Sequence, residues 1–478
     1  MALTILQQPL DAFTGGPEYT RVPVGQQLVF AVSDTALVAN AYNVKYIADV
    51  NISTKDNPVI LVDDTTRIGS FKTTPNNAGS GIFDLRPIVE TFVKPDNEAS
   101  EGQTSYKGNT NLNVPIHLVD LFSLSDNSVR FMGVDFYVEY SVTPTSETLQ
   151  TDPVTTSIWT VFNGVLHYNN PLTLINDNYG YDMDKFTFYN ANALQFLTNA
   201  PLVQYARATD YGTFSFLNWT TNAATWALPQ RVHKYETSFY NASGSLLLTK
   251  AEYNTVLTGG TGPSDFSPRG YMMYIGGFPA NLRVDAAVDA LFTAGTVEYY
   301  KTSITPVYGS GSLKYIVNII CADNPKNFEM IRLTWLNQWG TWDYYTFTMK
   351  STRSVSTKRI PYQQQEGTWN EGTFKIKGWK GGKKNFKVNS TQKIKLNTDF
   401  VTEAEGEWFE ELINSPEVYI VNEYDGTEVS PYNTITNKYI EPVTLTTSNY
   451  IRKTIANDKL MQYTFEIEKT KMQRTQSV

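Results

Sequence analysis

Ile331-Arg-Leu-Thr-Trp-Leu-Asn-Gln-Trp-Gly-Thr-Trp-Asp-Tyr-Tyr-Thr-Phe347 is the stretch around which the rest of this chain is organised. Apolar and polar residues alternate before and after a turn at Asn337 to Gly340, a pattern that predicts a β-hairpin. Large apolar side chains on both faces of the return strand are typical of a strand covered on each side. A second sheet of the same chain or another subunit would supply that cover. We therefore select four candidate contact residues: Trp335, Trp339, Trp342 and Tyr344.

The composition is that of a globular protein rich in β-sheet. The chain has 478 residues, of which 41% are hydrophobic, 18% charged and 13% aromatic, and aromatic residues favour strands. No apolar run approaches the roughly 18 residues that span a membrane. The first residues lack the basic start and apolar stretch of a signal peptide, so we expect a protein made and kept in a cytoplasm.

Short alternating runs separated by Gly, Asn, Asp and Pro clusters predict a mainly β fold, with tandem immunoglobulin-like β-sandwich domains and a small C-terminal α+β domain. The C-terminal helix is indicated by the capping-box pattern of Thr402 and Glu405, followed by an apolar stripe that includes Trp408. We expect four segments: an N-terminal β-sandwich at 1–150, a central β-rich domain at 157–350 that alternatively divides near 275, a basic β-hairpin at 351–400, and the α+β domain at 401–478.

Charge is distributed unevenly along the chain. The total is −8, yet residues 351–400 carry 11 Lys or Arg against 3 Asp or Glu, a net +8. Residues 401–478 carry 7 against 13, a net −6. Opposite charges of this size on separate segments would attract neighbouring copies of the chain. The candidate acidic residues in the C-terminal segment are Glu403, Glu405 and Glu407.

The basic segment alternates lysines with apolar residues, which predicts an amphipathic hairpin whose lysines lie on one face and whose aromatic side chains lie on the other. Three interpretations remain open for it. It is a solvated face over a dry core face, or a contact between subunits, or a nucleic-acid surface on which bases stack. Because the whole chain is acidic, nucleic acid is the least favoured of the three. The lysines concerned are Lys375, Lys377, Lys380, Lys383 and Lys384.

Residues with catalytic or metal-binding chemistry are few and scattered. The single cysteine, Cys321, excludes internal disulfides and cysteine-based zinc sites. The three histidines, at 117, 167 and 233, share no short spacing, so we interpret each as a half-buried strand residue. Asp182 and Asp184 would suit Ca²⁺ or glycoside chemistry, although their turn-rich surroundings explain them as well. We expect no catalytic residue, no metal and no cofactor, and leave metal binding at this pair open.

Six short motifs, in order along the chain, resemble virion structural proteins of tailed bacteriophages that infect Bacteroidota, including crAss-like phages. This resemblance implies a particle component of the tail or head-to-tail apparatus, assembled in the host cytoplasm, with copies of itself and other virion proteins as partners. It supplies no catalytic residues. The motifs begin at Leu3 (LTILQQP), Asn43 (NVKYIADV), Gly81 (GIFDLR), Phe196 (FLTNAP), Trp335 (WLNQWGTWD) and Glu411 (ELINSPEVY).

Sequence reasoning thus favours a non-enzymatic structural subunit of a phage tail, ring or collar, present in many copies. The alternative is a receptor- or glycan-binding tail protein, with or without hydrolase activity, in which Trp339, Trp342 and Tyr344 form an exposed stacking platform. No long β-helical repeat of the kind found in tail spikes with lyase activity is visible, which counts against that alternative.

Overall fold

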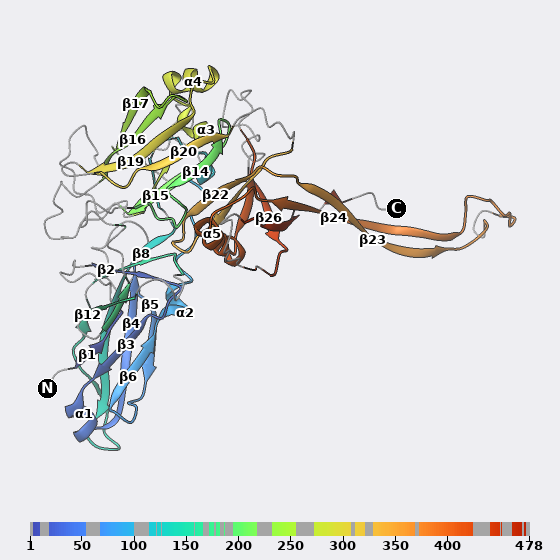
Figure 1. The fold of residues 1–478 in the computed structure, drawn as a ribbon. Helices are drawn as coiled ribbons and strands as arrows, with labels where there is room; N and C mark the ends of the chain where they lie inside the picture. Colours follow the sequence, from blue (N-terminus) through green and yellow to red (C-terminus); the bar gives the residue numbers. More distant parts are fainter. Residues whose placement is uncertain are drawn as a thin grey trace. The chain divides into compact units, whose positions relative to one another are not determined.

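A computed structural model of the chain divides it into two compact units, which are described one at a time (Figure 1). Unit 1 comprises Met1–Ala322, Leu336–Tyr344 and Glu423–Thr436, and unit 2 comprises the remainder. The structure describes residues 3–9, 19–53, 67–99, 114–120, 122–125, 127–156, 158–165, 172–175, 178–181, 186, 195–217, 232–254, 272–306, 311–320, 328–368, 372–423, 440–449, 451, 461–470 and 473–474.

The N-terminal part of unit 1 contains two sheets with one apolar core between them. The first sheet has the order β1-β3-β6, with bounds Thr4–Gln7, Val29–Ser33 and Ser80–Asp84. The second has the order β2-β11-β8-β4-β5, with bounds Tyr19–Pro23, Ile158–Phe162, Val129–Ser141, Tyr42–Ile52 and Arg67–Thr73. Two short strands, β9 (Thr148–Gln150) and β10 (Val154–Thr155), add to β8, and two short helices, α1 (Thr35–Asn40) and α2 (Arg86–Val89), connect strands.

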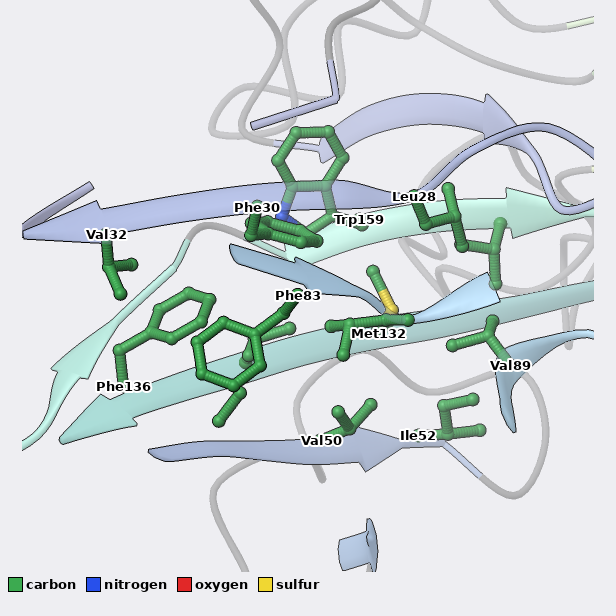
Figure 2. Close-up of a cluster of buried hydrophobic side chains, with 14 of the residues drawn as sticks. Leu28, Phe30, Val32, Val50, Ile52, Phe83, Val89, Met132, Phe136 and Trp159 are labelled. Atoms are coloured by element: carbon green, nitrogen blue, oxygen red, sulfur yellow. The ribbon is translucent and has the colours of Figure 1, made fainter. Parts of the chain in front are cut away.

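Large side chains from both sheets interlock in this core (Figure 2). The Phe30 ring from β3 meets Trp159 from β11 edge-on, with 5.6 Å between ring centroids. Phe136 from β8 lies 5.7 Å from Phe30 and 5.7 Å from Phe83 of β6. Fully burying one such side chain is worth about 1.5–3 kcal/mol, so aromatic contacts across the two layers stabilise the sandwich.

The expected boundary between 150 and 157 lies inside this sandwich. Strand β11 pairs antiparallel with β8, through Trp159↔Met132, and parallel with β2, through Ile158↔Tyr19. The stretch before β11 is rich in Thr and Pro, a composition typical of a linker, and it therefore indicates a domain boundary. The buried Trp159 of β11 nevertheless belongs to the first core.

The central part of unit 1 contains three further sheets. A five-stranded sheet has the order β14-β20-β19-β16-β17, with bounds Val203–Arg207, Tyr315–Ile320, Tyr299–Pro306, Val232–Tyr240 and Leu246–Tyr253. A three-stranded sheet has the order β15-β18-β7, with bounds Thr213–Leu217, Met272–Gly276 and Phe122–Leu124. The division considered near 275 therefore falls within β18. A hairpin of β12 (Leu172–Ile175) and β13 (Asn178–Tyr181), helices α3 (Pro279–Leu282) and α4 (Ala286–Thr293), and the short 3-10 helix η3 (Ile116–Leu118) complete the described elements.

The predicted aromatic hairpin is confirmed as β21 (Ile331–Leu336) and β22 (Trp342–Phe347). It opens an eight-stranded sheet of order β22-β21-β25-β26-β27-β24-β23, to which β28 adds through β24. The remaining bounds are Val418–Val421 (β25), Ile440–Leu445 (β26), Thr464–Lys469 (β27), Gly382–Asn397 (β24), Thr352–Gln364 (β23) and Gln473–Arg474 (β28). Strands from 351–400 and from 401–478 pair directly, as β24 with β27, so the boundary expected at 400 falls within one sheet.

Helix α5 (Glu403–Asn414) confirms the clearest helix prediction. The Glu405 backbone N–H donates to Thr402 Oγ1 at 3.3 Å, and the Thr402 backbone N–H donates to Glu405 Oε2 at 2.8 Å. These two bonds form the capping box and satisfy donors that a helix start leaves open. The predicted apolar stripe buries Trp408, Phe409 and Leu412.

The described chain is mainly β, with several sheets, and this architecture is consistent with β-sandwich domains. Among its described helices, none combines the length and the apolar character needed to cross a membrane.

Candidate assembly surface

The two longest paired strands continue beyond the unit 2 sheet as a two-stranded ribbon (Figure 1). Strand β24 pairs β27 only over Lys393–Asn397, whereas its pairing with β23 extends to Gln364↔Gly382. The segment 355–392, which the structure describes at 355–368 and 372–392, contains this extension, and we call it the ribbon arm. Within it, β28 contributes two pairs at Asn389 and Ser390. A two-stranded ribbon without a covering layer is marginally stable in water, so the length of this one indicates a structural purpose.

The register of the ribbon arm overturns the predicted amphipathic hairpin. The partner of β24 is β23, and residues 373–380 form no strand. Directly opposed residues share a face, and the register opposes Arg359 to Val388 and Ile360 to Lys387. These two pairs lie on opposite faces, since successive side chains alternate. Cationic and apolar side chains are therefore mixed on both faces, and no dry face exists along the arm.

Apolar side chains on the ribbon arm are exposed to solvent in the single chain. Ile376 is 81% exposed and Trp379 is 68% exposed. The arm also carries 8 Lys or Arg against 2 Asp or Glu, a net +6. An exposed apolar surface with a charged surround is characteristic of an interaction site. The exposed large apolar residues of the arm are Val355, Ile360, Phe374, Ile376, Trp379 and Phe386.

Hydrogen bonds connect the described residues of the tip loop of the arm, 365–368 and 372–381. The Thr368 side chain is buried; its hydroxyl donates to the Thr373 carbonyl at 3.3 Å and accepts from the Lys375 backbone N–H at 3.0 Å. Gly367 has a φ of 81°, and a Cβ there would lie 2.0 Å from the Phe374 ring. Only glycine tolerates both that backbone conformation and the close ring. The described part of the tip is consequently held by specific contacts of Thr368 and Gly367.

Trp379 contacts three lysines of the arm. The Nζ atoms of Lys377 and Lys380 each lie 5.6 Å from the centroid of its ring system, within the range of a cation–π interaction. Lys384 Nζ donates to the Trp379 carbonyl at 3.2 Å. Two of the five lysines selected from the sequence thus flank one exposed indole and a third contacts its backbone, while Lys375 and Lys383 are exposed nearby in the sequence.

A β-bulge turns one more aromatic side chain outward. The register shifts between Ile360↔Lys387 and Pro361↔Asn385, which leaves Phe386 as the extra, unopposed residue. Phe386 is exposed. Proline on the neighbouring edge strand removes one backbone donor and discourages another strand from pairing there. A partner would therefore contact the side chains of the arm more readily than it would pair with the backbone of its edge strand β23.

An ion pair anchors the base of the arm to the sheet. Lys393 Nζ lies 2.9 Å from Glu466 Oε1 on the paired strand β27. The hydrogen bond with Glu466 raises the pKa of Lys393, and the bonds from Lys393 and the Thr446 hydroxyl lower the pKa of Glu466. Both groups are solvent-exposed, so we treat the pair as a positional restraint on the arm and assign it little stability.

The four aromatic residues selected from the hairpin are buried within the single chain. Trp335 is 0% exposed and Trp339, Trp342 and Tyr344 no more than 4%. The ring centroids of Trp335 and Trp408 of α5 lie 4.9 Å apart, and those of Trp339 and Phe186 lie 4.2 Å apart. They fill cores and cannot reach another copy, so their assignment as contact residues is corrected. The exposed glycan-stacking platform expected from Trp339, Trp342 and Tyr344 is wrong for the same reason.

The polar ends of these buried aromatic residues have partners in unit 1. Tyr344 Oη lies 2.8 Å from His117 Nδ1 and 3.0 Å from Thr213 Oγ1, and Trp342 Nε1 donates to the Asp96 carbonyl at 2.8 Å. His117 also meets the Trp342 ring edge-on at 4.9 Å. His117 lies in η3, not in a strand, and it is fully buried. It was missed as a packing partner because it is over 200 residues distant in sequence.

The acidic candidates lie on α5. Glu403 and Glu407 are exposed, whereas Glu405 is half-buried and engaged in the capping box. Glu410 continues the spacing of Glu403 and Glu407 along the helix surface, opposite the buried Leu412. The helix thus presents a stripe of three carboxylates.

No metal centre is visible in the part of the chain that the structure describes, where no three His, Cys, Asp or Glu side chains gather to hold an ion. Four residues considered for such chemistry, His167, Asp182, Asp184 and Cys321, lie outside the described residues, as does the side chain of His233. A cavity beside Trp342, Asp343 and Tyr344 measures about 10 Å³, enough for one water and too small for a substrate.

Comparisons with known proteins give no relative from which an activity can be inferred. No family model and no curated protein matches the chain. Among solved structures, the native conformation of E. coli alpha-2-macroglobulin aligns over 84% of this chain and 22% of that one, with 8% identity and a TM-score of 0.18. A likeness this low supports no argument about fold or function.

Proposed function

We propose that this chain is a non-enzymatic structural subunit of a bacteriophage virion, a tail, ring or collar component assembled in many copies. The ribbon arm is the observation that carries the proposal. It exposes six large apolar side chains to water along a long ribbon, three of them in its strands and three in its tip loop. Such a surface costs solubility unless a partner covers it. The six sequence motifs that resemble phage virion proteins support the particle context.

Other features are consistent with a structural role. The buried aromatic residues of the hairpin and α5 stabilise the fold around which the arm is mounted. The immunoglobulin-like tandem arrangement and the α+β character of the C-terminal segment are part of the same proposal. The glycan-binding alternative required Trp339, Trp342 and Tyr344 to form an exposed stacking surface, and these residues are buried in cores.

Sedimentation velocity and negative-stain imaging of the purified full-length chain test the proposal. We expect closed rings or larger assemblies of the wild-type protein. Deleting the tip, by joining Gln364 to Gly382 through a short Asn-Gly turn, should leave a folded monomer, because the arm beyond the sheet contributes little to either core.

The control shortens a different hairpin loop, one without lysines or aromatic residues: residues 241–245 between β16 and β17 are replaced by the same Asn-Gly turn. This variant should assemble like the wild type. A wild-type chain that stays monomeric at all accessible concentrations, or a tip deletion that assembles normally, would contradict the proposed function.

A further inference from the structure

The ribbon arm needs a partner whose chemistry its own residues specify. Its exposed apolar side chains include the β-branched residues Val355, Ile360 and Ile376. Branched aliphatic side chains have no flat face for stacking on bases, whereas single-strand nucleic-acid surfaces rely on aromatic stacking. Apolar side chains with surrounding lysines instead fit an apolar protein surface with an acidic rim. Half of the exposed large apolar residues of the arm are branched aliphatic and half are aromatic, a mixture that fits a protein surface better than a row of stacked bases.

The charge of the chain itself supplies such a surface. The ribbon arm carries a net +6, and since the whole chain carries −8, the rest of the chain, which we call the body, carries −14. Two arms repel each other and two bodies repel each other, while an arm and a body attract. An isologous contact, in which the same patch meets itself, is thus disfavoured at the arm.

On the basis of the proposed function, we propose that the ribbon arm of each copy docks on the acidic body of a second copy, in a heterologous contact. Each copy then donates one arm and accepts another. Contacts of this kind produce a ring when the rotation between copies closes and a filament when it does not. Trp379, exposed and flanked by Lys377 and Lys380, is the anchor that the accepting surface takes up.

A chain whose arm keeps a net charge of only +1, which we call the neutral-arm variant, tests the direction of the contact. Replacing Lys375, Lys377, Lys380, Lys383 and Lys384 by Gln leaves the body unchanged, so this labelled variant accepts an arm normally but donates its own arm more weakly. Mixed with nuclease-treated wild-type protein, it should enter assemblies and shorten them in proportion to its fraction. Trp379→Ala is a second variant with the same expected effect and no change in charge.

A photoreactive residue at the tip identifies the accepting surface. Ile376→p-benzoylphenylalanine, in full-length protein, keeps the Trp379 anchor and should cross-link to the body of another copy, as mapped by mass spectrometry of mixed light and heavy isotope-labelled chains. Cross-links from arm to arm would overturn the heterologous contact. Exclusion of both variants from wild-type assemblies would overturn it as well.

These outcomes separate the two proposals. A wild-type chain that does not assemble defeats the proposed function and this inference together. Assembly that persists while the neutral-arm variant is excluded defeats only the heterologous contact. Assembly that nuclease treatment abolishes also defeats only this inference, because the occupant of the arm is then a nucleic acid.

Discussion

At the scale of single residues, the nine tryptophans of this chain serve opposite purposes according to their burial. Trp335 is fully buried and contacts Trp408, while Trp379 is exposed at the arm tip. Trp335→Ala should lower the free energy of unfolding by about 3–5 kcal/mol, because a large cavity forms in a packed core. Trp379→Ala should change it by less than about 0.5 kcal/mol. Denaturant unfolding of both variants measures the difference.

The contrast between the two tryptophans is also a check on the surface assignment. If Trp379→Ala destabilises the monomer as strongly as Trp335→Ala, the arm tip is packed against its own chain. The exposed apolar surface on which both proposals depend would then not exist. If Trp335→Ala is neutral, the hairpin is not part of a core.

A second residue-scale prediction concerns Asp285, which caps α4 and pairs with Lys250 of β17. Burial opposes the charged form, but hydrogen bonds from Lys250 Nζ and from the Val288 and Ala287 backbone N–H groups hold the pKa of Asp285 below its ordinary value of 3.8. A lowered folded pKa contributes stability that is present above the unfolded pKa and is lost as pH falls through the folded pKa. The contact should therefore stabilise unit 1 at neutral pH and fade in acid.

Asp285→Asn keeps a capping side chain and removes the charge. Because both partners are partly exposed, we expect a loss of about 0.5–1 kcal/mol near pH 7. The difference from wild type should shrink below about pH 4. The hydrogen bond with Asp285 also raises the pKa of Lys250 above 10.5, so the same contribution is lost as pH rises beyond that value. A difference that is constant from pH 3 to pH 8, in thermal unfolding, would exclude this ion pair as its source.

At the scale of elements, α5 depends on its start. Thr402→Ala removes the hydroxyl that accepts the Glu405 backbone N–H and should cost about 1 kcal/mol. Glu405→Ala should cost a similar amount, and the double variant should cost less than the sum, since each side chain completes the other's motif. Far-UV circular dichroism during urea unfolding gives the three values. Strict additivity would show that the capping box does not act as a unit.

The same elements show which features the sequence could predict. Helix α5 is predictable because one buried face imposes a period on its sequence, and the β21–β22 hairpin, buried on both faces, is predictable from aromatic residues on either side of a turn. Strand β23 was missed. Its 13 residues, Thr352–Gln364, are almost all exposed, so no alternation of apolar residues marks it as a strand. The alternation of Lys and apolar residues at 373–380 predicts a partner strand for β24 there, but the structure has the tip loop at these residues.

The candidate site was predicted in part for the same reason. The lysines were found from composition alone, and the structure brings them together on the arm. The contact role given to Trp335, Trp339, Trp342 and Tyr344 was wrong, since a sequence cannot distinguish cover by the same chain from cover by another. Trp342 is covered by His117, and no local pattern connects residues so far apart. The exposure of the apolar residues in β23 and β24 depends on how these two strands pair, and no period in the sequence encodes that pairing.

At the scale of the whole molecule, the separation of charge between arm and body makes assembly sensitive to salt. The Debye length falls from about 10 Å at 0.1 M salt to about 3 Å at 1 M. The attraction between a +6 arm and a −14 body should weaken accordingly, and the apparent association constant measured by sedimentation should fall. Apolar contacts around Trp379 persist in high salt, so assembly should weaken without vanishing.

Charge exchange gives the decisive form of this prediction. Glu403, Glu407 and Glu410 form the acidic stripe of α5, and reversing all three to Lys should weaken assembly, as should reversing Lys375, Lys380 and Lys383 to Glu. A chain that carries both sets of changes restores opposite charges and should recover at least part of the lost association.

The matched control reverses Glu90, Glu98 and Glu147, three exposed acids of unit 1, with the same change in net charge. If that control rescues the reversed arm equally well, net charge alone explains the attraction; rescue by the α5 reversal only means that the arm recognises this helix. Because the two outcomes differ in position and not in total charge, they distinguish a specific docking site from general electrostatic attraction.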